Sequence, residues 1–348
     1  ADPHHSGTPS QGALLVTLPW GSGEGQVGLV RTVEGLTYGP EALAAAPDGR
    51  IAVLDSANHR VLFLDAQGQY TGAAAVSLAE PRFLAVDDER LYVLDCDADR
   101  QMVTIDWTGA TLDTALLPEL PDVVTALFAA PEGPCVEVAH DSTFLITAPL
   151  TASGRPEPDG ASADSAHPSA HASVRALAGR PVDPQMERVA KVSYSPGQKA
   201  RIRLFGIDRS TLASTPRADF RQSLAPGRDL EHLVSVDGDG HGGLIIGARL
   251  LDNGPKGEGN ASLVLTRLAS SSNGGPGVGG PSAEQVGDEL LLADQSYAYL
   301  GQPYVVAPDG RVLQPVADDA GYSIFVHSFA TASTPSAGTP AATPEVQP

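Results

Sequence analysis

Cysteines, basic residues and long apolar runs are all scarce in this sequence of 348 residues. The two cysteines, Cys96 and Cys135, are too few for a disulfide framework, and they form either one bridge or two free thiols. Lys and Arg number 22 against 42 Asp and Glu, which gives a formal net charge of -20. Because phosphate binding needs clustered basic side chains, this balance argues against nucleic acid as a partner. No apolar run approaches the ~20 residues that span a bilayer, so we expect no direct membrane insertion in this segment.

Helical periodicity, aromatic residues and nucleotide-binding motifs are also scarce or absent. No amphipathic segment with a helical period is longer than two turns, which predicts an all-β chain. Aromatic residues make up 5% of the sequence, a low value for a sugar-binding surface built from aromatic rings. The sequence contains no nucleophile elbow, phosphate-binding loop or dinucleotide fingerprint. No enzyme class is therefore favoured by a local motif.

The most informative feature that is present is a repeat of about 40 residues. Residues 40–55 read PEALAAAPDGRIAVLD, residues 81–95 read PRFLAVDDERLYVLD, and a third unit opens at Pro121. Each unit alternates short apolar stretches with tight turns, as half-buried antiparallel strands do. A repeat of this length with strand content predicts a β-propeller, in which each repeat is one four-stranded blade.

The number of blades follows from the turns. In the first unit we expect strands at 42–46, 50–54, 60–65 and 70–76, with Pro47-Asp-Gly49 as the first hairpin turn. Similar turns at 195–197, 237–240 and 308–310 bring the total to six. The extra length between them lies in two low-complexity insertions, at about 151–184 and 270–284, which we expect to be surface loops.

The last unit contains only three expected strands, at 304–307, 311–316 and 322–329. We predict that residues 26–33, which precede the first repeat, supply its missing outer strand and close the ring. The expected fold is an all-β, six-bladed β-propeller with four-stranded antiparallel blades. It occupies residues 26–329 as a single domain, between an N-terminal extension at 1–25 and a Thr/Ser/Pro/Ala-rich disordered stalk at 330–348.

Residues 40–69 resemble the NHL repeat. The resemblance rests on the turn Asp48-Gly-Arg50, the strand end Val53-Leu-Asp55, the segment Asn58-His-Arg60-Val61 and the closing Gly68. It continues more loosely over residues 81–109 and covers about a third of the chain. NHL propellers include bacterial sensor ectodomains, protein- or RNA-binding modules and relatives of streptogramin lyase, and certain lactonases share the six-bladed architecture. The resemblance therefore implies a fold more strongly than an activity.

The most motif-like cluster consists of Asp55, Asn58 and Arg60. These residues form either a binding triplet or a structural unit in which Arg60 bridges to Asp55 and to backbone carbonyls of the blade, while Asn58 occupies the turn. The Asp–Arg pair recurs in the second unit as Asp95 and Arg100. A catalytic or binding residue has no need to recur in each blade, so we favour the structural interpretation.

Other candidate sites are weaker. The loop that contains Asp237 and Asp239 resembles the calcium loops of integrin-type propellers, but Ser235 and Gly243 stand where further acids are needed. We therefore interpret it as an Asp-Gly hairpin and expect no cofactor, with calcium at the two aspartates as the alternative. Asn260 lies in an N-glycosylation sequon.

The leading functional hypothesis is an extracytoplasmic propeller, secreted or on a bacterial cell surface, that binds a protein or a small-molecule ligand without catalysis. It is motivated by the acidic charge, the stalk composition and the lack of a convergent catalytic set. One alternative is a lyase or lactonase with a divalent metal in the central channel. Another is a structural surface protein that self-associates.

Overall fold

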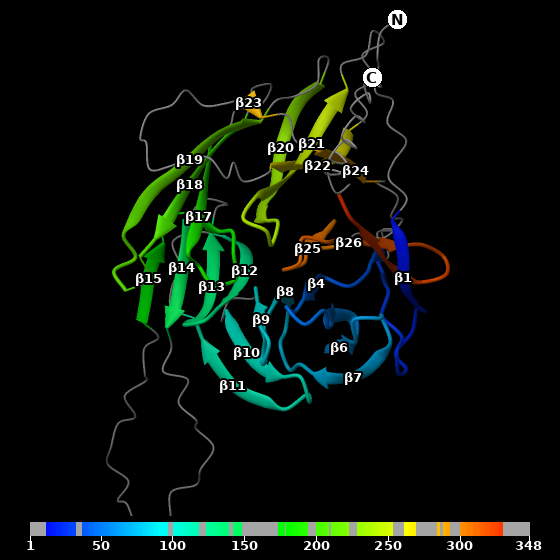
Figure 1. Cartoon of the computed structure of the whole chain (residues 1–348). Coiled ribbons are helices and arrows are strands. Elements are labelled where there is room, and N and C mark those ends of the chain that lie inside the picture. Colours follow the sequence, from blue (N-terminus) through cyan, green and yellow to red (C-terminus); the bar gives the residue numbers. More distant parts are fainter. Residues whose placement is uncertain are drawn as a thin grey trace, which may run out of the picture.

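The computed structural model describes residues 12–32, 37–96, 100–117, 123–138, 142–147, 173–177, 179–193, 200–208, 210–222, 228–252, 261–268, 284–285, 288–292 and 300–329. Within these ranges the chain forms β-strands and a short 3-10 turn, η1 (Ser56–Asn58), with no α-helix. Six antiparallel sheets stand around a common axis as the blades of a propeller (Figure 1). The prediction of a six-bladed, all-β propeller is confirmed. No helix in the described ranges is long and apolar enough to cross a membrane.

The first three blades follow one another directly along the chain, each from its inner to its outer strand. The first blade consists of β4 (Ala42–Ala45), β5 (Ile51–Asp55), β6 (Arg60–Leu64) and β7 (Tyr70–Ala75). The second consists of β8 (Pro81–Val86), β9 (Arg90–Asp95), β10 (Gln101–Asp106) and β11 (Thr111–Leu116). The third consists of β12 (Val124–Ala130), β13 (Gly133–Val138), β14 (Ser142–Thr147) and β15 (Ser173–Leu177).

The last three blades include strands from distant parts of the chain. The fourth consists of β16 (Arg180–Pro181), β17 (Arg188–Ser193), β18 (Arg201–Ile207) and β19 (Ser214–Gln222), with β23 (Glu284–Gln285) added in parallel at its outer edge. The fifth consists of β20 (Arg228–Gly238), β21 (Leu244–Asp252), β22 (Ala261–Leu268) and β24 (Asp288–Leu292). The sixth consists of β25 (Val305–Val306), β26 (Val312–Ala317), β27 (Tyr322–His327) and β1 (Ala13–Leu18). A small separate hairpin pairs β2 (Val30–Arg31) with β3 (Thr37–Tyr38).

The local sequence explains the strands of the first blade. The residues of β5, IAVLD, are all buried, as expected for a strand enclosed on both faces by neighbouring blades. Its hairpin with β4 turns at Gly49, whose φ of 90° is unfavourable for residues with a Cβ. The Asp48 carboxylate accepts the backbone N–H of Arg50 at 3.0 Å and fixes this turn.

The hydrophobic core is divided among the interfaces between neighbouring blades. Each of six apolar clusters joins side chains of two adjacent blades, and one of them joins the sixth blade to the first. In that closing cluster, Leu18 of β1 and Ile324 of β27 pack with Val53 of β5. Burying each such side chain stabilises the fold by ~1.5–3 kcal/mol. The ring is therefore sealed by apolar packing at its junction as it is elsewhere.

The strand that closes the ring lies earlier than predicted. Closure by an N-terminal strand is confirmed, but the strand is β1, which pairs antiparallel with β27, and residues 26–33 do not join this sheet (Figure 1). The segment 26–33 contributes Val27 to the closing cluster, while Val30 is 44% exposed and belongs to the small hairpin. An outer strand needs one face on the core over its whole length, and β1 meets this need with Leu15, Val16 and Leu18. Part of the expected extension at 1–25 thus belongs to the propeller.

The insertion predicted at 151–184 also needs correction. Its last part contains β15, which pairs with β14 as the outer strand of the third blade, and β16, the inner strand of the fourth. A short strand that carries one buried anchor, Leu177, was hidden by the Ser- and Ala-rich composition of its surroundings. Residues 151–172, 269–283 and 330–348 lie outside the described residues.

Candidate functional site

The connection from β1 to β4 joins the outer strand of the sixth blade to the inner strand of the first. Residues 20–28 of this connection form a loop closed by backbone hydrogen bonds from Val27 to Pro19 and from Gly21 to Val27. The indole Nε1 of Trp20 donates to the carbonyl of Asp318 at 2.8 Å, which fastens the loop to the sixth blade.

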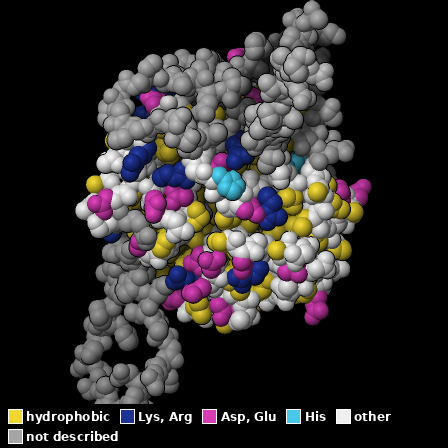
Figure 2. Space-filling model, viewed as in Figure 1, with side chains coloured by type: hydrophobic (Ala, Val, Ile, Leu, Met, Phe, Trp, Pro, Cys, Tyr) yellow, Lys and Arg dark blue, Asp and Glu magenta, His cyan; other side chains and the backbone are white. Residues whose placement is uncertain are grey.

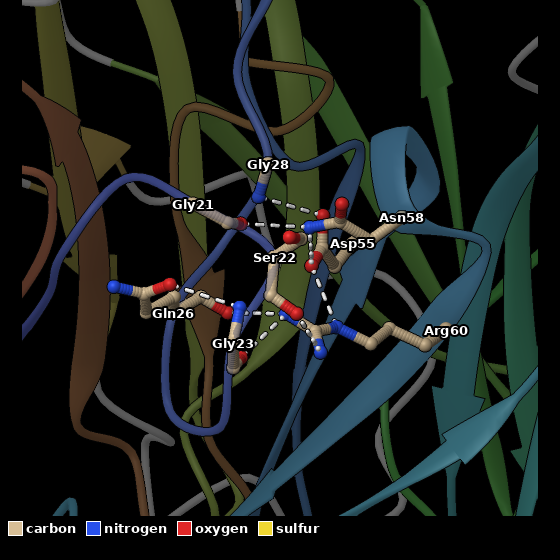
Figure 3. A network of polar contacts seen from close by, with 8 residues as sticks. All are labelled: Gly21, Ser22, Gly23, Gln26, Gly28, Asp55, Asn58 and Arg60. Carbon is tan, nitrogen blue, oxygen red and sulfur yellow. Dashed lines mark hydrogen bonds and ion pairs between the residues drawn. The ribbon is translucent and has the colours of Figure 1, made fainter.

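The three residues Asp55, Asn58 and Arg60 fasten the same loop to the first blade (Figure 3). The buried Asp55 carboxylate accepts the side chains of Asn58 at 2.7 Å and Arg60 at 3.0 Å, and also the backbone N–H of Gly28 at 2.9 Å. The Arg60 guanidinium donates to the carbonyls of Ser22, Gly23 and Gln26 at 2.8–3.1 Å, and Asn58 donates to the carbonyl of Gly21. The sequence predicts that Arg60 binds carbonyls of its own blade, but the carbonyls that it binds belong to the loop 20–28, the closing loop.

The second blade uses its equivalent aspartate in a similar way. Asp95, which is 5% exposed, accepts the backbone N–H groups of Ala79 and Glu80 at 2.8 and 3.0 Å. Arg100 follows residues outside the described ranges and has a left-handed φ of 44°. In both blades the repeated aspartate at the end of the second strand therefore holds the backbone that arrives from the preceding blade.

The backbone that Asp95 holds, at Ala79 and Glu80, forms part of the wall of a cleft of about 250 Å³ between the first and second blades. The cleft lies where the inner strands β4 and β8 begin, close to the axis, since β4 contacts both β8 and β25. Its lining combines apolar and charged side chains: Val30, Tyr38, Gly39, Glu41, Ser56, Ala57, Ala79, Glu80, Pro81 and Arg82.

Glu41 is the half-buried acid of this cleft. Burial raises the pKa of its carboxyl group, with a smaller upward effect from Glu80 and an opposing effect from Arg82. The segment that enters the sixth blade packs against it, because a Cβ on Gly301 would lie 2.8 Å from the Glu41 carboxylate. Gln302 of that segment accepts the backbone N–H of Leu43 at 2.9 Å. Glu41 therefore stands where the sixth, first and second blades meet.

The charges at the rim of the cleft are more exposed. Arg82 and Glu80 form an ion pair of 3.7 Å, and their side chains are 58% and 59% exposed. With Glu41 and Glu80 ionised, their two carboxylates and the guanidinium of Arg82 give the cleft one net negative charge. On the face shown in Figure 2, acidic and basic side chains lie among one another rather than in separate patches. The lining of the cleft likewise carries both signs of charge.

Both cysteines are free thiols, so the bridge considered from the sequence does not form. The backbone N–H of Cys96 donates to the carbonyl of Glu80, which places this cysteine just behind the cleft. Burial raises the pKa of the Cys96 thiol to about 11, so it is protonated at neutral pH and a poor nucleophile. The Sγ of Cys135 lies 3.3 Å from the Sδ of Met186, between the third and fourth blades.

Asp237, a candidate metal ligand, instead belongs to a partly buried chain of polar side chains that links four blades. It accepts Arg180 at 3.1 Å and Ser235, and Ser235 in turn contacts the hydroxyl of Tyr304. Arg180 also binds the fully buried Glu137 at 3.2 Å. Burial raises the pKa of Tyr304, so its hydroxyl stays protonated at neutral pH.

Asp239, the second candidate, closes its own hairpin. The carboxylate, which is 3% exposed, accepts the backbone N–H groups of His241 and Gly243 and the guanidinium of Arg267 at 3.0 Å. The described residues contain no group of three or more His, Cys, Asp or Glu side chains arranged to hold a metal ion. With arginines already on both aspartates, this donor set does not fit calcium. Asn260 lies outside the described residues.

Comparison with known proteins agrees with the architecture. The profile of the NHL repeat family matches residues 37–62. The chain is a six-bladed β-propeller that contains an NHL repeat. No curated protein sequence matches it.

Several solved structures match this chain at low sequence identity. Hydrazine synthase from Kuenenia stuttgartiensis is 16% identical, with a TM-score of 0.46 over 83% of this chain and 79% of that one. A luciferin-regenerating enzyme is 11% identical, with a TM-score of 0.44 over 92% and 96%. Virginiamycin B lyase from Staphylococcus aureus is 10% identical, with a TM-score of 0.40 over 83% and 95%. Similarity at these identities and TM-scores does not indicate a shared activity.

Sequence reasoning did not identify Glu41, Glu80 or Arg82 as site residues. A signal was nevertheless present, because Glu41 and Arg82 each follow the proline that opens a repeat, Pro40 and Pro81. Equivalent positions of neighbouring blades lie side by side around the axis of a propeller. Charged residues at such positions therefore mark the face of the ring on which a cleft can form.

Proposed function

We propose that the chain is an extracytoplasmic NHL-like propeller that binds a ligand, or a side chain of a protein partner, without catalysing a reaction. The cleft between the first and second blades carries this proposal. It combines apolar walls with a small number of polar groups, as ligand sites do. The buried Asp95 holds the backbone of Ala79 and Glu80, so this part of the wall is in place before a ligand arrives.

The chemistry of the cleft favours binding over catalysis. Its only acid with a raised pKa is Glu41, and no His or Cys side chain is among the residues that line it. The nearest thiol, Cys96, is protonated at neutral pH. A nucleophile paired with a base, or a pair of carboxyls with opposite pKa shifts, is the usual mark of hydrolytic or lyase chemistry.

The extracytoplasmic location is supported by composition. Residues 330–348 consist largely of Thr, Ser, Pro and Ala, a composition typical of stalks outside the cytoplasm. Protease treatment of intact producing cells tests this point. Loss of the full-length chain is expected for a surface protein, and survival until the cells are lysed would contradict it.

The binding function is tested by a fragment screen observed on the protein by NMR, with neutral, cationic and anionic compounds. Compounds that bind are expected to shift the signals of Ala79 and Ser56, which line the cleft. In Ala79→Trp the indole ring should occupy the cleft and block the compounds, so these shifts should disappear. Ala75→Trp places the same ring on β7, away from the cleft, and should leave them unchanged. A screen without any compound sensitive to Ala79→Trp would overturn the proposal.

A further inference from the structure

We propose that the ligand of this cleft carries a protonated primary amine on a short apolar stem, with the ammonium group seated against Glu41. The inference rests on the proposed binding function and specifies the chemical class of its ligand. The amine belongs either to a free small molecule or to a lysine side chain of a protein partner, and the chemistry is the same in both.

The first argument is the state of Glu41. Its side chain is half-buried, yet within the described part of the chain its carboxylate makes no hydrogen bond or ion pair. The nearest cation, Arg82, lowers its pKa less than burial raises it. A carboxylate partly withdrawn from water without a partner is stabilised in its ionised form when a cation or an N–H donor of a ligand reaches it.

The second argument is size. The cleft volume of about 250 Å³ lies below the ~300–1,000 Å³ typical of sites for drug-sized molecules. Val30, Tyr38 and Pro81 offer apolar walls against which methylene groups can pack, as they do along the stem of a lysine. Ser56 provides a hydroxyl oxygen that can accept a second N–H of an ammonium group.

The third argument is the position of Arg82 at the rim. Its guanidinium is only loosely paired with Glu80, at 3.7 Å, and repels additional positive charge from the entrance. A singly charged amine offsets this repulsion by neutralising Glu41, whereas each further charge of a polycation adds repulsion that Glu41 no longer offsets. A carboxylate ligand would reach Arg82 but would leave Glu41 facing a like charge.

Binding of such a ligand depends on pH in a defined direction. The titratable or charged groups around Glu41 are Glu80 and Arg82 from the second blade and Tyr38 from the connection, while Gly301 and Gln302 of the sixth blade do not titrate. A bound ammonium favours ionised Glu41, so affinity is highest where Glu41 is ionised and the amine is protonated. Affinity falls as the pH falls through the Glu41 pKa, and this fall begins at a higher pH than for an ordinary glutamate.

The test compares n-butylamine with n-butanol and butyrate, titrated into the full chain and followed through the NMR signals of the cleft. Butylamine should bind at least ~10-fold more tightly than butanol, which corresponds to about 1.4 kcal/mol. Glu41→Gln should reduce the affinity for butylamine to that for butanol. Glu89→Gln removes an exposed acid at a turn of the second blade, outside the cleft, and should change nothing.

The outcomes separate this inference from the binding function itself. If butanol or butyrate shifts the cleft signals as strongly as butylamine, or if Glu41→Gln leaves butylamine binding intact, the ligand class is wrong and the binding function stands. If none of the three probes nor any screened compound reaches the cleft, both proposals are overturned. Tighter binding of N-acetyl-lysine N-methylamide than of butylamine would identify a protein lysine as the source, and equal or weaker binding a free amine.

Discussion

At the scale of single residues, the charged side chain of Asp55 has a structural role. Its side chain is fully buried, while that of Arg60 is 16% exposed, and the pair joins the closing loop to the first blade. A buried ion pair adds little compared with an apolar pair, but removal of one partner leaves the other charge without compensation. The importance of Arg60 for stability therefore lies mainly in the carboxylate that it neutralises.

Replacement of Arg60 by alanine should lower the free energy of unfolding by ~2–4 kcal/mol, because Asp55 loses its counter-ion and three carbonyls lose a donor. Urea denaturation followed by circular dichroism measures this change. The matched control is Arg311→Ala, which breaks an ion pair with Asp309 whose side chains are 36% and 49% exposed. Arg311→Ala should lower the free energy of unfolding by ~1 kcal/mol or less. Equal effects of the two substitutions would show that the Asp55 network is not stabilising.

His327 should make stability depend on pH. The ring is 3% exposed and contacts Gln314 at 3.0 Å, and burial lowers its pKa below the usual value of about 6.5. The unfolded chain thus binds a proton at a higher pH than the folded chain does. The contribution of His327 is complete above about pH 6.5 and is lost as the pH falls through its folded pKa. Denaturation of the wild type and of His327→Gln is measured in parallel from pH 8 to pH 5. The free energy of unfolding of His327→Gln should fall less over this range than that of the wild type. An identical dependence on pH in the two proteins would refute this prediction.

At the scale of elements, the connection from β1 to β4 also holds the sixth blade to the first through the hydrogen bonds of its loop 20–28. Its residue Gly28 lies so close to the first blade that an added Cβ would approach Ala57 to 2.5 Å and Asp55 to 2.9 Å. Such contacts leave no room for a methyl group without displacement of the loop. Glycine is therefore required here by close approach rather than by its backbone angles.

Gly28→Ala should destabilise the protein by ~1–3 kcal/mol through overpacking at this contact. Gly72→Ala is the control, because a Cβ at that position in β7 meets only Phe63, at an ordinary 3.7 Å. Its effect should stay within ~0.5 kcal/mol. Thermal unfolding of the two variants at one scan rate gives the comparison. A Gly28→Ala variant as stable as Gly72→Ala would mean that the loop does not pack against the first blade in solution.

The elements differ in how far the sequence alone predicts them. The strands of the first blade match the predicted ranges to within one residue, because each hairpin carries its own turn signal. The strands β1 and β15 were missed, since both pair with partners across long or low-complexity segments. Pairing of this kind depends on which sheet edge the rest of the fold leaves unpaired. A local sequence pattern contains no information about that edge.

At the scale of the whole molecule, the ring brings together residues that sequence distance keeps apart. Glu41 and Gly301 meet across the junction of the first and last blades, and Arg180 joins acids of the third and fifth blades. The structural interpretation of Asp55 and Arg60 could be made from their repetition. The cleft could not be predicted in this way, because its charged residues, Glu41, Glu80 and Arg82, come together only once the first and second blades stand side by side.

The closed ring itself is tested most directly by a cross-link between β1 and β27. Thr17 is paired with Ser323, and their hydroxyl oxygens are 2.8 Å apart, so cysteines at both positions lie within reach of a disulfide. The control, Val30→Cys with Ser323→Cys, represents closure by residues 26–33. Mild oxidation of the folded protein, followed by peptide mapping under non-reducing conditions, identifies the bridges formed, including any to the native thiols of Cys96 and Cys135. The account predicts an intramolecular bridge between positions 17 and 323 and none between 30 and 323, and the reverse pattern, or no bridge in either variant, would contradict it.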